Sequence, residues 1–83
     1  MILSKSELAE ELGVSRPRVS QFVRRGLPVR RDGRIDLERA CEWVVENIDP
    51  WGEGSVARGH ASEWLYLLRR QRARNDVEDD RPS

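Results

Sequence analysis

Arginine and glutamine side chains gather in one short stretch, residues 16–25, which reads RPRVSQFVRR. A guanidinium group can make paired hydrogen bonds to guanine or to phosphate, and a glutamine amide can pair in the same way with adenine. The chemistry for holding a nucleic-acid backbone and for reading its bases is therefore present in a single segment. The stretch contains no acidic residue, so it predicts a surface that binds nucleic acid.

These residues also have the periodicity of a helix with two different faces. Val19, Phe22 and Val23 recur at i, i+3 and i+4 and form an apolar stripe. Other residues of this helix, with the residue before it, are the expected DNA contacts: Ser15, Arg16, Pro17, Arg18, Gln21, Arg24 and Arg25. The first half of a reading helix enters the groove most deeply, so Arg18 and Gln21 are expected to read bases. Arg24 and Arg25 are expected mainly to hold phosphates.

Another helix must hold this one in place, and the residues before it in the sequence predict such a helix. Ser4 and Glu7 have the spacing of a capping box, so a helix is expected to begin at residue 5. Gly13 supplies the left-handed residue that ends this helix, and Ser15 caps the next one. Gly26 ends the second helix in turn. Two short helices joined by a Gly-Val-Ser corner predict a helix-turn-helix.

Residues 27–36, LPVRRDGRID, predict a small wing after the second helix. An Asp-Gly pair between two short segments is a strong hairpin signal, because a type I′ turn needs positive φ at both central positions. The hairpin would carry Arg30, Arg31 and Arg34 near its tip, within reach of phosphates or of a minor groove. A plain connecting turn with solvated arginines is the alternative.

Charge is arranged in blocks, although the formal net charge of the chain is zero. Residues 16–34 contain seven arginines and one acid, whereas residues 35–57 contain six acids and one arginine. Because the basic block coincides with the expected helix-turn-helix and wing, a nucleic-acid surface is favoured over an ordinary solvated face.

A third helix is expected after Asp36, which is its N-cap. Its inner stripe follows the helical period and consists of Leu37, Ala40, Cys41, Val44, Val45 and Ile48. Cys41 is expected to be a small buried apolar residue, because no base accompanies it, and His60 has no second ligand near it. No residues with the spacing of a catalytic, metal or cofactor site are found. We therefore expect neither an enzyme nor a metal or cofactor.

The chain is expected to divide near residue 50. Residues 1–49 form the DNA-binding domain, residues 50–54 a linker rich in glycine and proline, and residues 55–76 a C-terminal helix. Residues 77–83 are polar and acidic and are expected to be disordered. The C-terminal helix carries an apolar band of Trp64, Leu65, Leu67 and Leu68. This band is expected to form a homodimer or higher homo-oligomer; the alternative is that it folds back on the third helix near Trp43.

Length and composition set the broad class. Eighty-three residues allow one small domain, and apolar residues that find no place in its thin core would favour self-association. A single cysteine excludes an intramolecular disulfide, and no apolar run reaches the length of a membrane span. These features predict a cytoplasmic protein with no membrane partner, in a bacterium or in a phage-infected host cell.

Residues 4–48, SKSELAEELGVSRPRVSQFVRRGLPVRRDGRIDLERACEWVVENI, resemble the winged helix-turn-helix of the MerR-like superfamily. They are most similar to the DNA-binding domain of lambda-type phage terminase small subunits, and WLYLLRRQRARND resembles the helix that follows the linker in such subunits. The resemblance implies a mostly α fold with a β-hairpin wing. It also implies recognition of a viral packaging site as a dimer or higher assembly, without catalysis. The terminase large subunit is a further partner that the resemblance implies. Longer members of the family bind it through segments that follow the position of Ser83.

Three functions follow from these observations. The first is sequence-specific binding of double-stranded DNA as a terminase small subunit or as its DNA-binding domain. The second is a MerR-like or excisionase-like transcriptional regulator, which would use the same mechanism. The third is a protein-interaction module whose helix-turn-helix does not bind DNA; it predicts no binding to any duplex.

Overall fold

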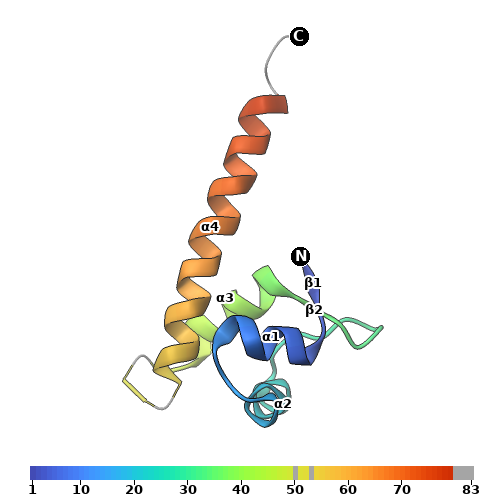
Figure 1. Cartoon of the computed structure of the whole chain (residues 1–83), viewed down its shortest axis with the longest axis vertical. Helices are drawn as coiled ribbons and strands as arrows, with labels where there is room; N and C mark the ends of the chain where they lie inside the picture. Colours follow the sequence, from blue (N-terminus) through green and yellow to red (C-terminus); the bar gives the residue numbers. More distant parts are fainter. Residues whose placement is uncertain (50, 53, 80–83) are drawn as a thin grey trace.

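The computed structural model describes residues 1–49, 51–52 and 54–79, with side chains described as far as residue 74. Within them the chain is mostly helical and has one small antiparallel sheet (Figure 1). The elements in order are β1 (Ile2–Leu3), α1 (Lys5–Leu12), α2 (Arg16–Arg25), β2 (Ile35–Asp36), α3 (Leu37–Asn47) and α4 (Ser55–Asp79). This architecture is compatible with the expected helical domain carrying a small wing.

The predicted ends of α1 are confirmed. The Ser4 hydroxyl accepts a hydrogen bond from the Glu7 backbone N–H at 3.2 Å, and the Glu7 carboxylate accepts one from the Ser4 backbone N–H at 3.0 Å. These two bonds complete the capping box, and the hydrogen bond from the Ser4 backbone is the main reason that the pKa of Glu7 lies below its ordinary value. Gly13 ends the helix with φ of 68°, a left-handed conformation that suits a residue without a Cβ.

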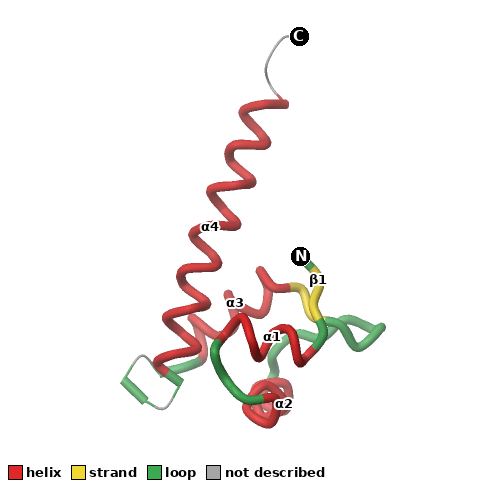
Figure 2. The backbone as a smooth tube through the Cα atoms, viewed as in Figure 1, coloured by secondary structure: helices red, strands yellow, loops and turns green. Residues whose placement is uncertain are grey.

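The predicted ends of α2 are confirmed as well. The Ser15 hydroxyl accepts from the Arg18 backbone N–H at 3.3 Å, and the Leu27 backbone N–H donates to the Phe22 carbonyl at 3.0 Å. Leu27 is buried beside the end of the helix. In Figure 2, α2 is seen nearly end-on while α1 lies across the view, so the two helices cross steeply. The short turn between them therefore fixes the direction in which α2 leaves the body.

The sheet pairs different segments from those of the expected hairpin. β1 and β2 are antiparallel, with Leu3 opposite Ile35 and Ile2 opposite Asp36. The turn after Arg30 is closed by its own backbone bonds, from Gly33 to Arg30 at 3.0 Å and from Arg30 to Arg34 at 2.8 Å. Only Gly33 in this turn has positive φ, whereas a type I′ turn would need two such residues. The N-terminus supplies the partner strand because pairing there buries both Leu3 and Ile35.

One hydrophobic core joins all four helices. Its fully buried members of largest volume are Phe22, Leu8, Leu12, Ile35, Leu37, Val19, Val44 and Cys41. Every residue of the inner stripe predicted for α3 belongs to this core or packs against it. Cys41 is buried as predicted, and burial raises the pKa of its thiol to about 12. The thiol is therefore neutral at ordinary pH.

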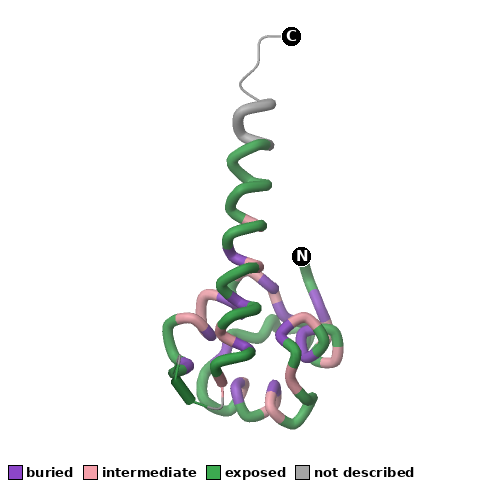
Figure 3. The backbone as a smooth tube through the Cα atoms, turned by 60° about the vertical axis from the view of Figure 1, so that its left-hand side comes forward, coloured by how far each residue is buried: buried purple, intermediate pink, exposed green. Residues whose placement is uncertain are grey.

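The first half of α4 also belongs to the core. Ala57, Ala61 and Leu65 are buried, and Figure 3 shows buried positions in the half of α4 nearer the body and exposed ones beyond it. α4 packs chiefly on α3 and also on α1. The fold-back alternative is therefore the observed one for the first half of this helix, whereas residues 69–74 are exposed. α4 continues to residue 79, beyond the predicted start of the disordered tail at residue 77. Residues 80–83 of that tail lie outside the described residues.

The described residues between α3 and α4 make several local contacts. The Asp49 carboxylate accepts from the Trp51 backbone N–H at 2.9 Å, and the Gly52 backbone N–H donates to the Asp49 carbonyl at 3.3 Å. A Cβ on Gly54 would lie 2.1 Å from a side-chain carbon of Ile48, so only glycine fits there. The expected linker is thus compact at these positions; its residues 50 and 53 lie outside the described part.

Candidate nucleic-acid interface

The α2 helix is anchored by its apolar stripe and turns its polar residues outward. Val19 is 0% exposed and Phe22 is 2% exposed, so this stripe fixes the rotation of the helix about its axis. Among the residues expected to contact DNA, Arg18 is partly buried and the others are exposed: Ser15, Arg16, Pro17, Gln21, Arg24 and Arg25. Most of the sequence-predicted residues of α2 are therefore accessible to a ligand.

Arg18 and Gln21 form a pair within this face. The Arg18 guanidinium donates to the Gln21 side-chain oxygen at 3.4 Å. Residues three apart lie on the same side of a helix, so their side chains are neighbours. The amide nitrogen of Gln21 remains a donor for an external acceptor. The two residues expected to read bases are thus adjacent and orient one another.

Arg25 has contacts that the sequence did not reveal. Its guanidinium donates to the Asn47 carbonyl at 3.4 Å and lies 5.8 Å from the centroid of the Trp43 ring. The Trp43 ring also packs against Phe22, with ring centroids 5.8 Å apart. Arg25 therefore links the end of α2 to α3, in addition to being exposed where a phosphate could reach it. Trp43 was predicted only as a neighbour of the C-terminal helix.

The loop between α2 and β2 carries the remaining predicted arginines. Arg30, Arg31 and Arg34 are all exposed. Asp32 lies among them: its carboxylate is 3.4 Å from the Arg30 guanidinium and accepts from the Arg34 backbone N–H at 3.0 Å. This carboxylate therefore offsets part of the positive charge of Arg30.

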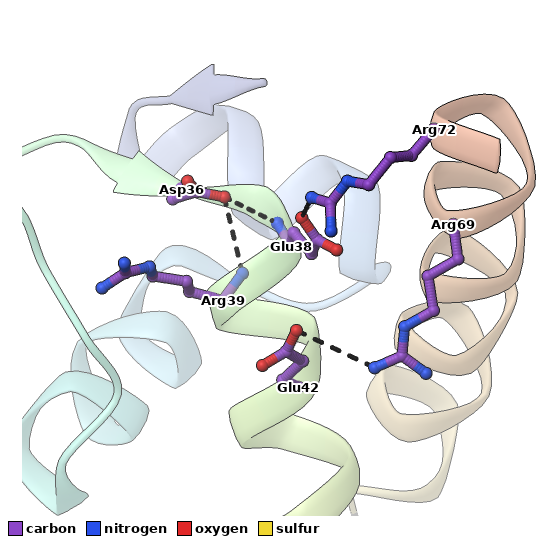
Figure 4. A network of polar contacts seen from close by, with 6 residues as sticks. All are labelled: Asp36, Glu38, Arg39, Glu42, Arg69 and Arg72. Atoms are coloured by element: carbon purple, nitrogen blue, oxygen red, sulfur yellow. Dashed lines mark hydrogen bonds and ion pairs between the residues drawn. The ribbon is translucent and has the colours of Figure 1, made fainter. Parts of the chain in front are cut away.

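Arg39 is a candidate that the sequence analysis missed. It lies on the first turn of α3 and helps to line a small groove of about 100 Å³ with Pro28, Val29, Arg30 and Asp36. Figure 4 shows its side chain pointing away from α4. The groove brings Arg39 close to the basic loop. The only signal in the sequence was a single arginine within an otherwise acidic block, which does not reveal this proximity.

The residues expected to form a dimer differ in their exposure. Leu65 is 6% exposed and belongs to the core, and Trp64 and Leu68 pack partly against it. Only Leu67, at 48%, is a largely exposed apolar residue of this set. Leu65 therefore belongs to the core of its own domain, and formation of a homodimer stays a prediction. Their spacing alone does not show which side of α4 meets α3.

Two arginines of α4 pair with the acidic face of α3. Arg72 bonds to Glu38, and Arg69 lies 3.8 Å from Glu42 (Figure 4). These pairs occur one helical turn apart on each helix, as expected for antiparallel neighbours. Part of the acidic block is therefore neutralised within the chain, and these two arginines serve to dock α4.

Comparisons of the chain with protein-family models, with curated proteins and with solved structures found no match. Within the described residues, no group of three or more histidine, cysteine or acidic side chains is arranged to hold a metal ion. In the same part of the chain, no helix is both long enough and apolar enough to cross a membrane.

Proposed function

We propose that this chain binds double-stranded DNA, with α2 as the helix that enters the major groove. The observation that carries the proposal is the division of α2 into two faces. Val19 and Phe22 are buried on one side, and arginine and glutamine side chains are exposed on the other, on a helix without an acid. An exposed basic helix held at a steep angle by a preceding short helix is the arrangement of a DNA-reading helix-turn-helix.

The positions along α2 suggest distinct roles. Arg18 and Gln21 lie in its first two turns and are proposed to contact base edges. Arg24 lies in the last turn and is proposed to contact phosphate. Arg31 and Arg34 of the following loop would extend the phosphate contacts to the flanking duplex.

The resemblance to terminase small subunits gives the proposal its biological setting, which is recognition of a packaging site on viral DNA. A transcriptional regulator would read DNA through the same residues, so the two roles differ in the duplex bound and not in the mechanism. In both cases the proposed protein is a binding protein and not an enzyme.

The test is selection from a pool of random duplexes followed by titration of the selected duplex and a scrambled one. We expect preference for the selected duplex, with an affinity that falls steeply as salt rises from about 50 to about 200 mM. Gln21→Ala should reduce the preference, and Arg24→Ala should weaken both duplexes alike. Lys5→Ala is the matched control, because it removes an exposed positive charge outside α2.

Two results would overturn the proposal. One is the absence of binding to any duplex by the folded chain, which would favour a protein-interaction module. The other is binding that Gln21→Ala and Arg24→Ala leave unchanged, because DNA would then be held by another surface.

A further inference from the structure

The side-chain amide of Gln21 has a defined orientation, which Arg18 imposes. The Arg18 guanidinium donates a hydrogen bond to the Gln21 Oε1 at 3.4 Å, from a position three residues earlier on α2. A guanidinium group has donors and no acceptor, so it pairs with the oxygen of an amide and not with its NH2 group. The amide oxygen of Gln21 therefore turns toward Arg18, and the NH2 group turns away from it.

Arg18 and Gln21 differ in how the helix presents them. The backbone N–H of Arg18 donates to the Ser15 hydroxyl at 3.3 Å in the capped first turn, and Arg18 is partly buried. Gln21 is exposed. Val19 is 0% exposed, and residues two positions apart lie on nearly opposite sides of a helix, so Gln21 points away from the core. Arg18 is thus placed to orient an amide that Gln21 carries outward.

We propose that Gln21, oriented by Arg18, reads guanine in the major groove and discriminates against adenine. This inference rests on the proposed binding of DNA by α2, and it adds the base that the helix selects. Adenine is the ordinary partner of a glutamine amide, because its N7 accepts from the NH2 group while its N6 amino group donates to the amide oxygen. Guanine presents two acceptors, N7 and O6, and needs only the NH2 group.

The positive charge of Arg18 is the physical reason for this preference. The guanidinium lies at the oxygen end of the amide, where the N6 amino group of adenine would have to bind. A cation repels the partial positive charge of that amino group and attracts the partial negative charge of the guanine O6. The hydrogen bond that the amide oxygen accepts also polarises the amide and strengthens its NH2 group as a donor.

The other two bases are weaker partners for this arrangement. In the major groove cytosine presents only an amino donor, and thymine presents one acceptor beside a methyl group. Guanine therefore has the edge with the most acceptors for an NH2 group that lies beside a cation. In this respect Arg18 is a positioning residue, since it acts on the choice of base through Gln21.

Competition titrations at one base pair of the selected duplex test the inference. The base pair is the one at which Gln21→Ala loses its preference. The original chain should bind guanine there about tenfold or more tightly than adenine. Inosine is the matched control base, because it keeps both N7 and O6, and it should bind within about threefold of guanine.

Arg18→Met tests the role of Arg18, because methionine is long but lacks the charge and the donors. The variant should lower the ratio of guanine to adenine affinity at this base pair to about one or below, since the Gln21 oxygen becomes accessible to the adenine N6 amino group. Arg18→Lys keeps a positive donor and should keep the preference for guanine. Arg24→Met is the matched control: Arg24 is an exposed arginine of the same helix, and its loss should weaken both duplexes and leave the ratio unchanged.

The ratio separates positioning from a merely structural role, which would lower affinity for both duplexes without moving the ratio. Circular dichroism confirms that each variant is folded. Preference of the original chain for adenine at this base pair, or a ratio that Arg18→Met leaves unchanged, would overturn the inference while DNA binding by α2 stands. A Gln21→Ala variant with unaltered preference at every base pair would also overturn it. A folded chain that binds no duplex would overturn the proposed function and this inference together.

Discussion

The guanidinium carbon of Arg25 lies 5.8 Å from the centroid of the Trp43 ring, so the last turn of α2 is held against α3 by a cation and an aromatic ring. Arg25→Ala should lower the free energy of unfolding by about 1 kcal/mol, because it removes this contact and the hydrogen bond to the Asn47 carbonyl. Arg24→Ala is the neighbouring control and should change stability by less than about 0.5 kcal/mol. Urea denaturation measures both, and equal effects would show that Arg25 has no structural role.

The arginines of the loop after α2 should contribute to the salt dependence of DNA binding. Replacing Arg30, Arg31 and Arg34 with glutamine should reduce the slope of log affinity against log salt by about 0.9 for each phosphate that these side chains no longer neutralise. Asp32→Asn should act in the opposite direction, because it releases Arg30 from the ion pair within the loop. A triple variant that is folded and keeps the original slope would make this loop a plain connector.

Leu65 and Leu67 should differ sharply in their effect on the stability of the domain. Leu65→Ala should cost about 2–3 kcal/mol, because this side chain is 6% exposed and fills the core between α4 and its neighbours. Leu67→Ala should cost less than about 0.5 kcal/mol, because its side chain is largely exposed. Thermal unfolding measures the stability of both variants, and a low protein concentration keeps self-association from affecting the result. Similar costs would contradict the observed orientation of α4.

Alkaline pH should destabilise the fold through Cys41. Burial raises the pKa of this thiol from 9.0 to about 12, so above pH 9 the unfolded chain loses a proton that the folded chain keeps. The stability that the neutral thiol contributes is fully present below the unfolded pKa. As pH rises from the unfolded pKa to the folded pKa, the free energy of unfolding should fall by about 1.4 kcal/mol per pH unit. Cys41→Ala removes this contribution, so its stability should fall less steeply between about pH 9 and about pH 11. If the free energy of unfolding fell equally with pH in both proteins, burial would not raise the pKa of the thiol.

Local features of the sequence determined the helices and their ends. Ser4 with Glu7, Ser15, Asp36 and the glycine after α1 are caps, and their hydrogen bonds involve residues only a few positions away. The apolar stripes of α2 and α3 were readable for the same reason, because helical periodicity relates neighbours in sequence. The outward position of Gln21 and Arg24 followed from those stripes. The expected functional face of α2 could therefore be placed before its surroundings were known.

Contacts between distant residues were decided only by the tertiary structure. The turn chemistry of residues 30–34 did not show that Ile35 pairs with Leu3, because the choice of partner strand depends on what the pairing buries. The apolar band of α4 held both Leu65 and Leu67, and the packing of α3 and α1 selected which of them became core. The contact of Arg25 with Trp43 has the same origin, since no local pattern relates residues 18 positions apart along the chain. Packing free energy depends on contacts between residues that are distant along the chain, so local patterns in the sequence do not reveal it.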